Sequence, residues 1–560
     1  MKILYIHPGQ TASAPDSCIT AKFPGASFQT AGGFSFSPAK LLKLRKSSKP
    51  GFDAVVVKST PPLNYFKELL LSLFFLGFPA GEKYIRIEGE DSIIPVKPFR
   101  LIPLILMFLP VVFLSACVAA AALVYTCAAS VGVSFVKNRK FQSVMPTEKS
   151  LVFLCPSLQL LETFRGSTSH VKGTLSGFVK SGWKPVIISP GKMDGVEGEY
   201  RIIPPLFRNL LTGGIVDMLF DMVFTFRAMG IIKKIKPAFI YQRHGRYCIS
   251  GVIISAFLGI PLVLEMNALL GWESGRWSNT GGLLRFFISL YEKICLSGAY
   301  RFSAISGKLR EDIIAAGAVP EKVFINPNGA DAQKFRPGCG GDEIRRETGI
   351  ENRVAAGFSG SFYPWHGVDF LADAIIKTIP ANSQLVFILI GEGPELAPLV
   401  KKLFDAGISV KPIRNALKEL FSRNEDSEVG KNPSVFVTGK IPPGEVPAFL
   451  DACDILLSPI GKGKEYSSPI KIFEYMAAGK AILCFEGGQM NDVFVNGKDA
   501  LMTAIDESAP FARALEKLAA DEKLRSELGK NAREKMLKQY TWQANAQRIT
   551  GSLYQESPTR

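Results

Sequence analysis

Short apolar runs alternate with longer amphipathic stretches along most of the chain after residue 150. KPVIIS, PAFIYQR and IPLVLEMN are each bounded by polar or turn-forming residues, and a stretch of helical length follows the run. A second series begins near residue 353, with RVAAGFSG, QLVFILIG, VFVTGK, ILLSPI and AILCFEG. Uniformly apolar strands that alternate with helices are typical of parallel sheets covered on both faces. The pattern predicts an α/β chain with two Rossmann-like, doubly wound domains, at 141–335 and 336–538, facing a cleft.

The N-terminal residues 1–96 predict a smaller α/β extension. KILYIHP, DAVVVKST and EKYIRIEGE read as strands, and PLNYFKELLLSLFFLGF reads as a helix. The pattern assigns this unit no function.

A long hydrophobic segment separates the extension from the first large domain. Residues 101–136 are 36 consecutive uncharged, mostly apolar residues. One straight helix of this length extends for about 54 Å, whereas the hydrocarbon core of a bilayer is about 30 Å thick. A hairpin of two spans and a long helix broken at Pro103 or Pro110 both fit. Basic residues flank both ends, which favours a hairpin or re-entrant loop with both flanks in the cytoplasm. We expect a membrane segment at 97–140, and a buried core helix is the alternative.

The charge of the chain is unevenly distributed. The 560 residues carry a formal net charge of +16, yet residues 1–330 hold 37 Lys and Arg against 20 Asp and Glu, and the remainder holds 29 against 30. A basic half indicates an anionic partner. The sequence has no zinc finger, aromatic RNA-binding motif or basic low-complexity tail, so we expect an anionic membrane and no nucleic acid. The nine Cys form no C-x-x-C pair, which argues against a zinc site or a disulfide scaffold.

The predicted strand-to-helix turns hold the candidate chemistry, because doubly wound sheets bind ligands at the carboxyl ends of their strands. GSFYPWHG begins at Gly360, where a glycine backbone and a helix N-terminus can receive a phosphate. GEGPE begins at Gly391 and is short enough to admit a flat base. SSPIKIFEYMAAGK places Lys471 and Glu474 three residues apart on one helical face. An ammonium can hold a diphosphate and a carboxylate can accept both hydroxyls of a ribose, while an ordinary surface Lys–Glu pair is the alternative.

These segments resemble those of family 4 glycosyltransferases, which have the GT-B fold. The matching segments are SSPIKIFEYMAAGKAIL, NPNGADAQKF, GSFYPWHGVD, LIGEGPE and VTGKIPPGEVPAFLDACDILLSP, in the expected order. A weaker similarity extends through 150–330, with FRGSTSH and IPLVLEMNALL, and does not cover 1–140. The resemblance implies a nucleotide-sugar domain at 336–538 and a C-terminal tail, 539–560, that crosses back to the first domain. It also implies no metal and no cofactor besides the nucleotide-diphosphate sugar, and the sequence has no Asp-x-Asp motif.

The resemblance assigns the donor contacts to the second domain. Glu474 matches the glutamate that holds the ribose, and Lys471 serves the diphosphate, since a serine and a histidine replace the usual Arg and Lys of the first glycine turn. We place both with His244 of the first domain as candidate catalytic residues. A second family glutamate is replaced by Tyr466, which leaves the donor sugar open. The donor-side candidates are Gly360, Ser361, His366, Gly391, Glu392, Lys440, Ile441, Ser468, Pro469 and Ile470.

Polar residues at the predicted turns of the first domain are the acceptor-side candidates. His170, His244 and His366 are three of only four histidines, and all three fall at such turns; a structural hydrogen bond is the alternative for each. Glu265 is a candidate base if the reaction inverts, or else a buried structural carboxylate. The acceptor-side candidates are Gly166, His170, Arg243, Arg246, Glu265 and Asn267.

The sequence therefore predicts a metal-independent, hexosyltransferase-type enzyme. We expect it to move a sugar from a nucleotide-diphosphate sugar to a membrane-associated acceptor, either lipid-linked or a polysaccharide, as in polysaccharide biosynthesis. Retention of configuration is implied by the resemblance alone. A degenerate GT-B binding or scaffold protein and a nucleotide-sugar epimerase are the alternatives. The membrane segment and basic half predict the inner membrane, with the catalytic domains on its cytoplasmic side.

Overall fold

The computed structural model divides the chain into two compact units, residues 1–127 with 205–223 and residues 128–204 with 224–560. The residues that it describes are 2–6, 22–24, 26–31, 52–59, 80–87, 93–95, 106–136, 148–158, 166–193, 195–206, 211, 213–277, 282–413, 433–459, 468–504 and 507–554.

The first unit contains a five-stranded sheet with the strand order β2-β1-β3-β4-β5. Its strands are β1 (Lys2–Ile6), β2 (Ser27–Ala31), β3 (Phe52–Ser59), β4 (Ala80–Ile87) and β5 (Ile93–Pro95). All neighbours are parallel except β4 and β5. The consecutive Val55, Val56 and Val57 of the central strand β3 are all buried, as a strand covered on both faces requires. The helix predicted at 62–78 lies outside the described residues.

The hydrophobic segment differs from the expected hairpin. It forms one continuous helix of 29 residues, α5 (Phe108–Val136). Pro110 does not break the helix because it stands in the first turn, where a proline removes no intrahelical hydrogen bond. Pro103 lies outside the described residues. By length and composition, the stretch Phe108–Ser134 can cross a membrane.

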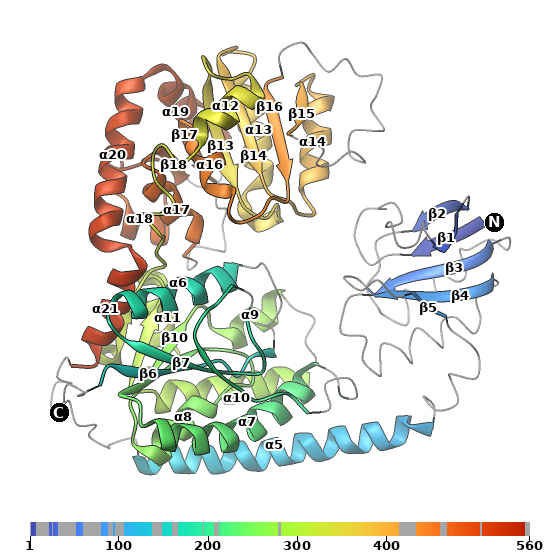
Figure 1. Ribbon diagram of the computed structural model, residues 1–560, viewed down its shortest axis with the longest axis vertical. Coiled ribbons are helices and arrows are strands. Elements are labelled where there is room, and N and C mark those ends of the chain that lie inside the picture. The colour runs from blue at the N-terminus through green and yellow to red at the C-terminus, as the bar shows by residue number, and fades with distance from the viewer. Residues whose placement is uncertain are drawn as a thin grey trace. The chain divides into compact units, whose positions relative to one another are not determined.

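The second unit contains two parallel seven-stranded sheets (Figure 1). The first has the order β12-β11-β10-β9-β6-β7-β8. Its strands are β6 (Ser150–Leu154), β7 (Lys184–Ser189), β8 (Glu199–Ile202), β9 (Phe239–Arg243), β10 (Leu262–Met266), β11 (Arg301–Ala304) and β12 (Val323–Ile325). The helices of this part of the chain are α6 (Gly166–Lys180), α7 (Gly213–Ile235), α8 (Ser250–Leu258), α9 (Leu270–Trp277), α10 (Gly282–Gly298), α11 (Gly307–Ala315) and the 3₁₀ turn η3 (Pro320–Lys322).

The second sheet has the order β15-β16-β14-β13-β17-β18-β19. Its strands are β13 (Val354–Ser359), β14 (Leu385–Ile390), β15 (Val410–Pro412), β16 (Val435–Gly439), β17 (Ile455–Ser458), β18 (Ala481–Phe485) and β19 (Leu501–Thr503). Its helices are α12 (Gly341–Thr348), η4 (Pro364–His366), α13 (Val368–Thr378), α14 (Leu396–Asp405), α16 (Val446–Asp451), α17 (Ile470–Ala478), α18 (Gln489–Val493) and α19 (Ser508–Ala520). In both sheets the strand order reverses beside the first strand, β6 or β13, which confirms the predicted doubly wound architecture and marks where such folds bind ligands.

The chain ends in two helices, α20 (Glu522–Gln539) and α21 (Trp542–Ser552). Figure 1 shows α20 beside the second sheet and α21 beside α6 of the first. Two glycines of α6 permit this approach: a methyl group at Gly173 would lie 2.1 Å from Trp542 Cε2, and one at Gly177 would lie 2.1 Å from the Trp542 carbonyl oxygen. The last helix is thus held on the first domain by contacts that any larger side chain would block.

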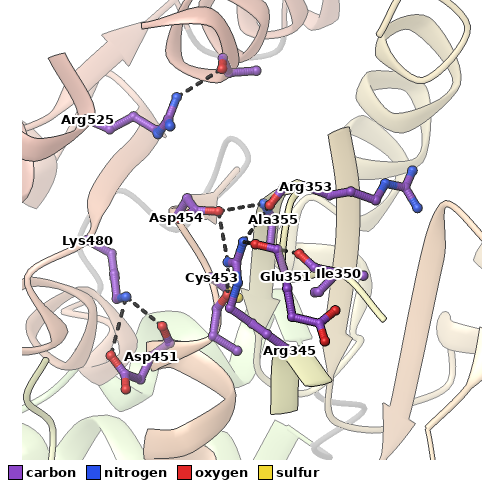
Figure 2. Close-up of polar contacts among 12 residues, drawn as sticks. Arg345, Ile350, Glu351, Arg353, Ala355, Asp451, Cys453, Asp454, Lys480 and Arg525 are labelled. Atoms are coloured by element: carbon purple, nitrogen blue, oxygen red, sulfur yellow. Dashed lines mark hydrogen bonds and ion pairs between the residues drawn. The ribbon is translucent and has the colours of Figure 1, made fainter. Parts of the chain in front are cut away.

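A polar hub fixes α12 to the amino ends of β13 and β17 (Figure 2). The Arg345 guanidinium donates to the Ala452 carbonyl at 2.7 Å and to Asp454 Oδ2 at 3.1 Å, and the same Asp454 oxygen accepts from the Ala355 N–H at 2.8 Å. Asp451 accepts from the Gly341 N–H at 2.9 Å, at the N-terminus of α12. Because these bonds lie at the opposite strand ends from the predicted site, we assign the hub to stability.

Candidate active site

The carboxyl ends of three neighbouring strands meet the start of α17. Gly360 follows β13, Gly391 follows β14 and Lys440 follows β16. The first two turns touch, since a methyl group on Gly391 would lie 2.0 Å from the Gly360 carbonyl oxygen. A bridge between Gly391 and Gly439 adds the third turn. The structure therefore brings together the segments that the sequence assigns to the donor.

Lys471, in the first turn of α17, points toward the Gly360 turn. Its Nζ lies 4.2 Å from the centroid of the Phe358 ring, and a methyl group on Gly360 would lie 2.7 Å from it. This Nζ is buried and has no hydrogen-bond partner within the part of the chain that the structure describes. Burial lowers the pKa of Lys471 to about 7, although the Glu474 carboxylate acts in the opposite direction. A buried ammonium without an acceptor is suited to receive an anion.

Glu474 lies one turn further along α17 and is half-buried, as Lys471 is. Burial raises its pKa to about 7, although the positive charges of Lys334 and Lys471 act in the opposite direction. These positions disagree with the alternative of an exposed surface pair. The face of α17 at this end of the sheet thus offers one cation and one carboxyl group, both held away from their usual pKa values by the cost of burying charge.

The Gly391 turn can bring its backbone close to a ligand. Gly391 has a φ of +124°, and its N–H donates to Thr438 Oγ1 at 3.2 Å. Next to it, the Glu392 carbonyl accepts from the Phe362 N–H at 2.9 Å, while the Glu392 carboxylate makes an exposed ion pair of 3.5 Å with Lys440 Nζ. Ile441 packs, half-buried, against the core of this domain.

Ser361 and His366 interact with each other across the turn. The His366 Nδ1 contacts the Ser361 carbonyl oxygen, and since a carbonyl only accepts, Nδ1 carries the proton. The Ser361 side chain is exposed and the His366 side chain is half-buried. The pair fixes the shape of the turn that follows Gly360.

The segment that precedes α17 is tied to the loop after β12. The Asn328 N–H donates to Ser468 Oγ at 3.1 Å, and the Asn328 side-chain amide donates to the Ser468 carbonyl. Ser468 is buried, Pro469 stands at the N-cap of α17, and Ile470 begins the helix. The entry of α17, and with it the position of Lys471, is therefore fixed by a residue of the first domain's last loop.

The other side of Asn328 belongs to a buried polar chain. Its Oδ1 faces His170 Nδ1, and His170 Nε2 lies 2.7 Å from Glu265 Oε2. Both ring nitrogens of His170 therefore face oxygen atoms of neighbouring side chains. This series of side-chain contacts connects α6, β10 and the start of α17.

Glu265, at the end of β10, has both oxygens engaged. Tyr241 donates its hydroxyl to Oε2 at 2.5 Å, and Asn267 donates its amide to Oε1 at 2.6 Å. Burial by itself raises the pKa of this carboxyl, but His170, Arg243 and the Tyr241 hydroxyl together hold it well below its usual range. Such a carboxylate is a poor proton acceptor, so this geometry fits the structural alternative better than a catalytic base.

The remaining first-domain candidates lie around the end of β9. His244 is buried, with Nε2 3.5 Å from Glu292 Oε2, and Arg243 Nη1 is 3.5 Å from Glu265 Oε1. Arg246 is half-buried. Gly166 begins α6, directly after residues that are not described.

Three residues of the site were not singled out from the sequence. Asn328, Tyr241 and Lys334 join the site through partners far away in the chain: Ser468, Glu265 and Glu474 respectively. Asn328 lies within NPNGADAQKF and Ser468 within SSPIKIFEYMAAGKAIL, so both segments carried a signal, but nothing in the sequence indicated that the two residues pair.

Two family models match the regions that contain this geometry. The model described as Glycosyltransferase Family 4 matches residues 164–334, and the model described as Glycosyl transferases group 1 matches residues 353–521. Together they cover more than half of the chain, one in each doubly wound domain. The chain is a family 4, group 1 glycosyltransferase.

The glycosyltransferase is similar to curated proteins over most of their length. It is 22% identical over 329 residues to alpha-maltose-1-phosphate synthase of Mycolicibacterium smegmatis, an alignment of 56% of this chain and 78% of that protein. It is 22% identical over 341 residues to the UDP-Gal:alpha-D-GlcNAc-diphosphoundecaprenol alpha-1,3-galactosyltransferase of Escherichia coli, which covers 60% of this chain and 78% of that protein.

A solved structure supports the fold of the glycosyltransferase. Anabaena Alr3699/HepE in complex with UDP superimposes with a TM-score of 0.53 at 17% identity, over 72% of this chain and 99% of that chain. This likeness confirms the GT-B architecture of two Rossmann-like domains. Among the described residues of the glycosyltransferase, no group of three or more His, Cys, Asp and Glu is placed to hold a metal ion.

Proposed function

We propose that this glycosyltransferase moves a sugar from a nucleotide-diphosphate sugar to a membrane-associated acceptor, lipid-linked or a polysaccharide. The observation that carries the donor part is the Nζ of Lys471 at the Gly360 turn, which is buried and has no hydrogen-bond partner among the described residues. An anionic diphosphate supplies the acceptor atoms that this ammonium lacks. The family membership and the UDP bound to Anabaena Alr3699/HepE support the same ligand class.

The chemistry follows from the charges at the start of α17. Breaking the glycosidic bond leaves negative charge on the diphosphate, which Lys471 and the glycine backbone stabilise. Glu474 accepts the ribose hydroxyls and thereby orients the donor. No metal is needed in this scheme, because the ammonium and the backbone meet the charge. We extend retention of configuration to this chain from family membership, and Glu265, with both oxygens engaged, suits a reaction without a strong base.

The acceptor part rests on α5 and on charge. α5 is long and apolar enough to cross a membrane, and residues 1–330 carry the whole positive excess. The E. coli relative is named for a diphosphoundecaprenol-linked acceptor. We infer an anionic inner membrane as the location, with both doubly wound domains on the cytoplasmic side, where nucleotide sugars are available.

The test is a donor screen with the full chain in membranes, with mass spectrometry of the lipid products. We expect one nucleotide sugar to yield a lipid or polysaccharide product one sugar heavier, and Lys471→Met and Glu474→Ala each to reduce transfer at least a hundredfold. Lys401→Met and Asp405→Ala are matched controls, because these residues form an exposed pair of 2.8 Å on α14 of the same domain. Undiminished transfer by the Glu474 variant would exclude the assignment.

The same screen separates the two alternatives. An epimerase would convert the free nucleotide sugar without an acceptor, and a binding or scaffold protein would bind UDP without turnover. Transfer that depends on Lys471 excludes both.

A further inference from the structure

Helix α5 presents two different faces. Its buried residues recur every three to seven positions and therefore lie on one side of the helix. They are Val111, Val118, Ala122, Thr126, Ala129 and Val133. The opposite side is exposed and apolar, with Phe113 at 72%, Val124 at 70% and Val131 at 57% exposure. At about 100° per residue, these three positions point within about 20° of one another and directly away from the buried stripe. One face is therefore covered by the protein along nearly the whole helix.

Two contacts show what holds the covered face. At the middle of α5, Tyr125 donates its hydroxyl to Asp221 Oδ2 on α7 at 3.3 Å. Near the end of α5, Val133 packs on the C-terminal residue of α10, where a methyl group on Gly298 would lie 2.9 Å from Val133 Cγ1. Asp221 is fully buried. One side of α5 thus contacts α7 at the middle of the helix and α10 near its end, and both partner helices carry charged residues.

This attachment is incompatible with a perpendicular span. A helix that crosses the bilayer places its middle at the bilayer centre, and Tyr125 is close to the middle of α5. Asp221 and the neighbouring Asp217 of α7 would then be drawn into the hydrocarbon, where ionisable groups are costly. A helix that lies in the membrane plane buries only its outer face, by about 5–10 Å, and leaves the covered face on the protein side.

We propose that α5 lies in the plane of one leaflet, with the line Phe113–Val124–Val131 in the acyl chains, and does not cross the membrane. This rests on the membrane part of the proposed function. A lipid leaflet fits better than a second copy of the chain, because the exposed apolar arc is wider than the narrow seam of a helix pair, and residues 106–136 contain no charge that would set a register. The basic excess of residues 1–330 favours anionic headgroups.

The experiment measures the depth of nitroxide labels in vesicles of phosphatidylglycerol and phosphatidylethanolamine. The full chain carries a single label at Phe113→Cys, Val124→Cys or Val131→Cys, in a background whose cysteines 18, 117, 127 and 339 are serine. From Phe113 to Val131 the helix rises about 27 Å. An in-plane helix gives all three labels the same depth within a few ångströms, whereas a spanning helix gives depths that differ by most of that rise. Val179→Cys, on the exposed surface of α6, is the aqueous control.

Lysine substitutions give a second readout. We expect Phe113→Lys, Val124→Lys and Val131→Lys each to weaken vesicle binding at least tenfold and to similar extents, with Val179→Lys unchanged. A graded depth, or a loss confined to the central Val124, overturns the in-plane proposal and leaves membrane attachment intact. Self-association through this face without vesicles overturns it in favour of a second copy. Failure to bind vesicles at all removes the membrane part of the proposed function as well, while sugar transfer to a soluble acceptor would still show the donor part to be correct.

Discussion

Binding of a nucleoside diphosphate should draw a proton from solution, and Lys471 should be its destination. Burial lowers the pKa of this lysine to about 7 in the unliganded protein. A diphosphate next to Nζ favours the charged form and should return the pKa toward its ordinary value of about 10.4. The perturbation is therefore the ligand itself, and the variant Lys471→Met removes the group that responds.

The size of the uptake follows from the two pKa values. At pH 8, a lysine with a pKa of about 7 is charged in roughly one-tenth of the free molecules, and nearly all are charged when the ligand is bound, so binding takes up about 0.9 proton. Glu474, whose pKa burial raises to about 7, is protonated in roughly one-tenth at pH 8, and releases that fraction when its carboxylate accepts the ribose hydroxyls. The net uptake should be about 0.8 proton. At pH 6 the balance reverses, because Lys471 is already charged and Glu474 is mostly protonated.

Isothermal titration of UDP in two buffers of different ionisation enthalpy measures this number directly. We expect about 0.8 proton taken up at pH 8 by the wild type, near zero for Lys471→Met, and slightly more than wild type for Glu474→Gln. Lys401→Met is the control, since Lys401 is an exposed lysine in the same domain. An uptake of zero in the wild type, or an equal uptake in Lys471→Met, would refute the placement of the diphosphate at this lysine.

Three further predictions concern stability. Gly391→Ala should lower the free energy of unfolding by about 3 kcal/mol and weaken UDP binding at least tenfold, because its Cβ would lie 2.0 Å from the Gly360 carbonyl oxygen, whereas Gly407→Ala, with open space around it, should cost about 1 kcal/mol and leave binding unchanged; urea unfolding and titration measure both. Arg345→Met should cost about 3 kcal/mol in urea unfolding with an unchanged donor KM, since the hub that it breaks lies at the far strand ends. Glu265→Gln should cost about 3 kcal/mol at neutral pH. Because the folded protein holds the pKa of Glu265 well below its usual range, this difference should be constant above pH about 5 and shrink as the pH falls.

Each of these predictions has an outcome that contradicts it. Equal losses in Gly391→Ala and Gly407→Ala would mean that backbone strain alone matters and that the close approach of the two turns does not. A raised donor KM in Arg345→Met would connect the hub to the site. A stability difference for Glu265→Gln that grows toward low pH would mean that the carboxyl is protonated in the folded protein, which contradicts the ion pair with His170.

The sequence was sufficient for features that depend on local pattern. The uniformly apolar runs RVAAGFSG and QLVFILIG form the adjacent central strands β13 and β14. Such runs predict central parallel strands, because a strand covered on both faces has no side exposed to water. The glycine turns after them and the helix that carries Lys471 and Glu474 were found in the same way, since turn and helix signals are local in the chain.

The sequence misled where length was the main signal. A run of 36 uncharged residues with basic flanks fits two spans, and the hairpin was expected on that basis. The structure has the single helix α5, which contains no residue that would turn it near its centre. Nothing in the sequence of α5 distinguishes its two faces, because apolar residues surround the helix; the buried stripe is decided by contacts with α7 and α10.

The sequence by itself therefore determined the doubly wound domains and the family, and it predicted which segments contact the donor. The tertiary structure decided what the individual charged groups do. It buried the Nζ of Lys471 with no hydrogen-bond partner among the described residues, enclosed Glu265 among Tyr241, Asn267 and His170, and set Asn328 between His170 and Ser468. The physical reason is that propensity and periodicity act over a few residues, whereas burial and hydrogen bonding, which set a pKa, join atoms that, in the pair of His170 and Asn328, are 158 residues apart in the chain.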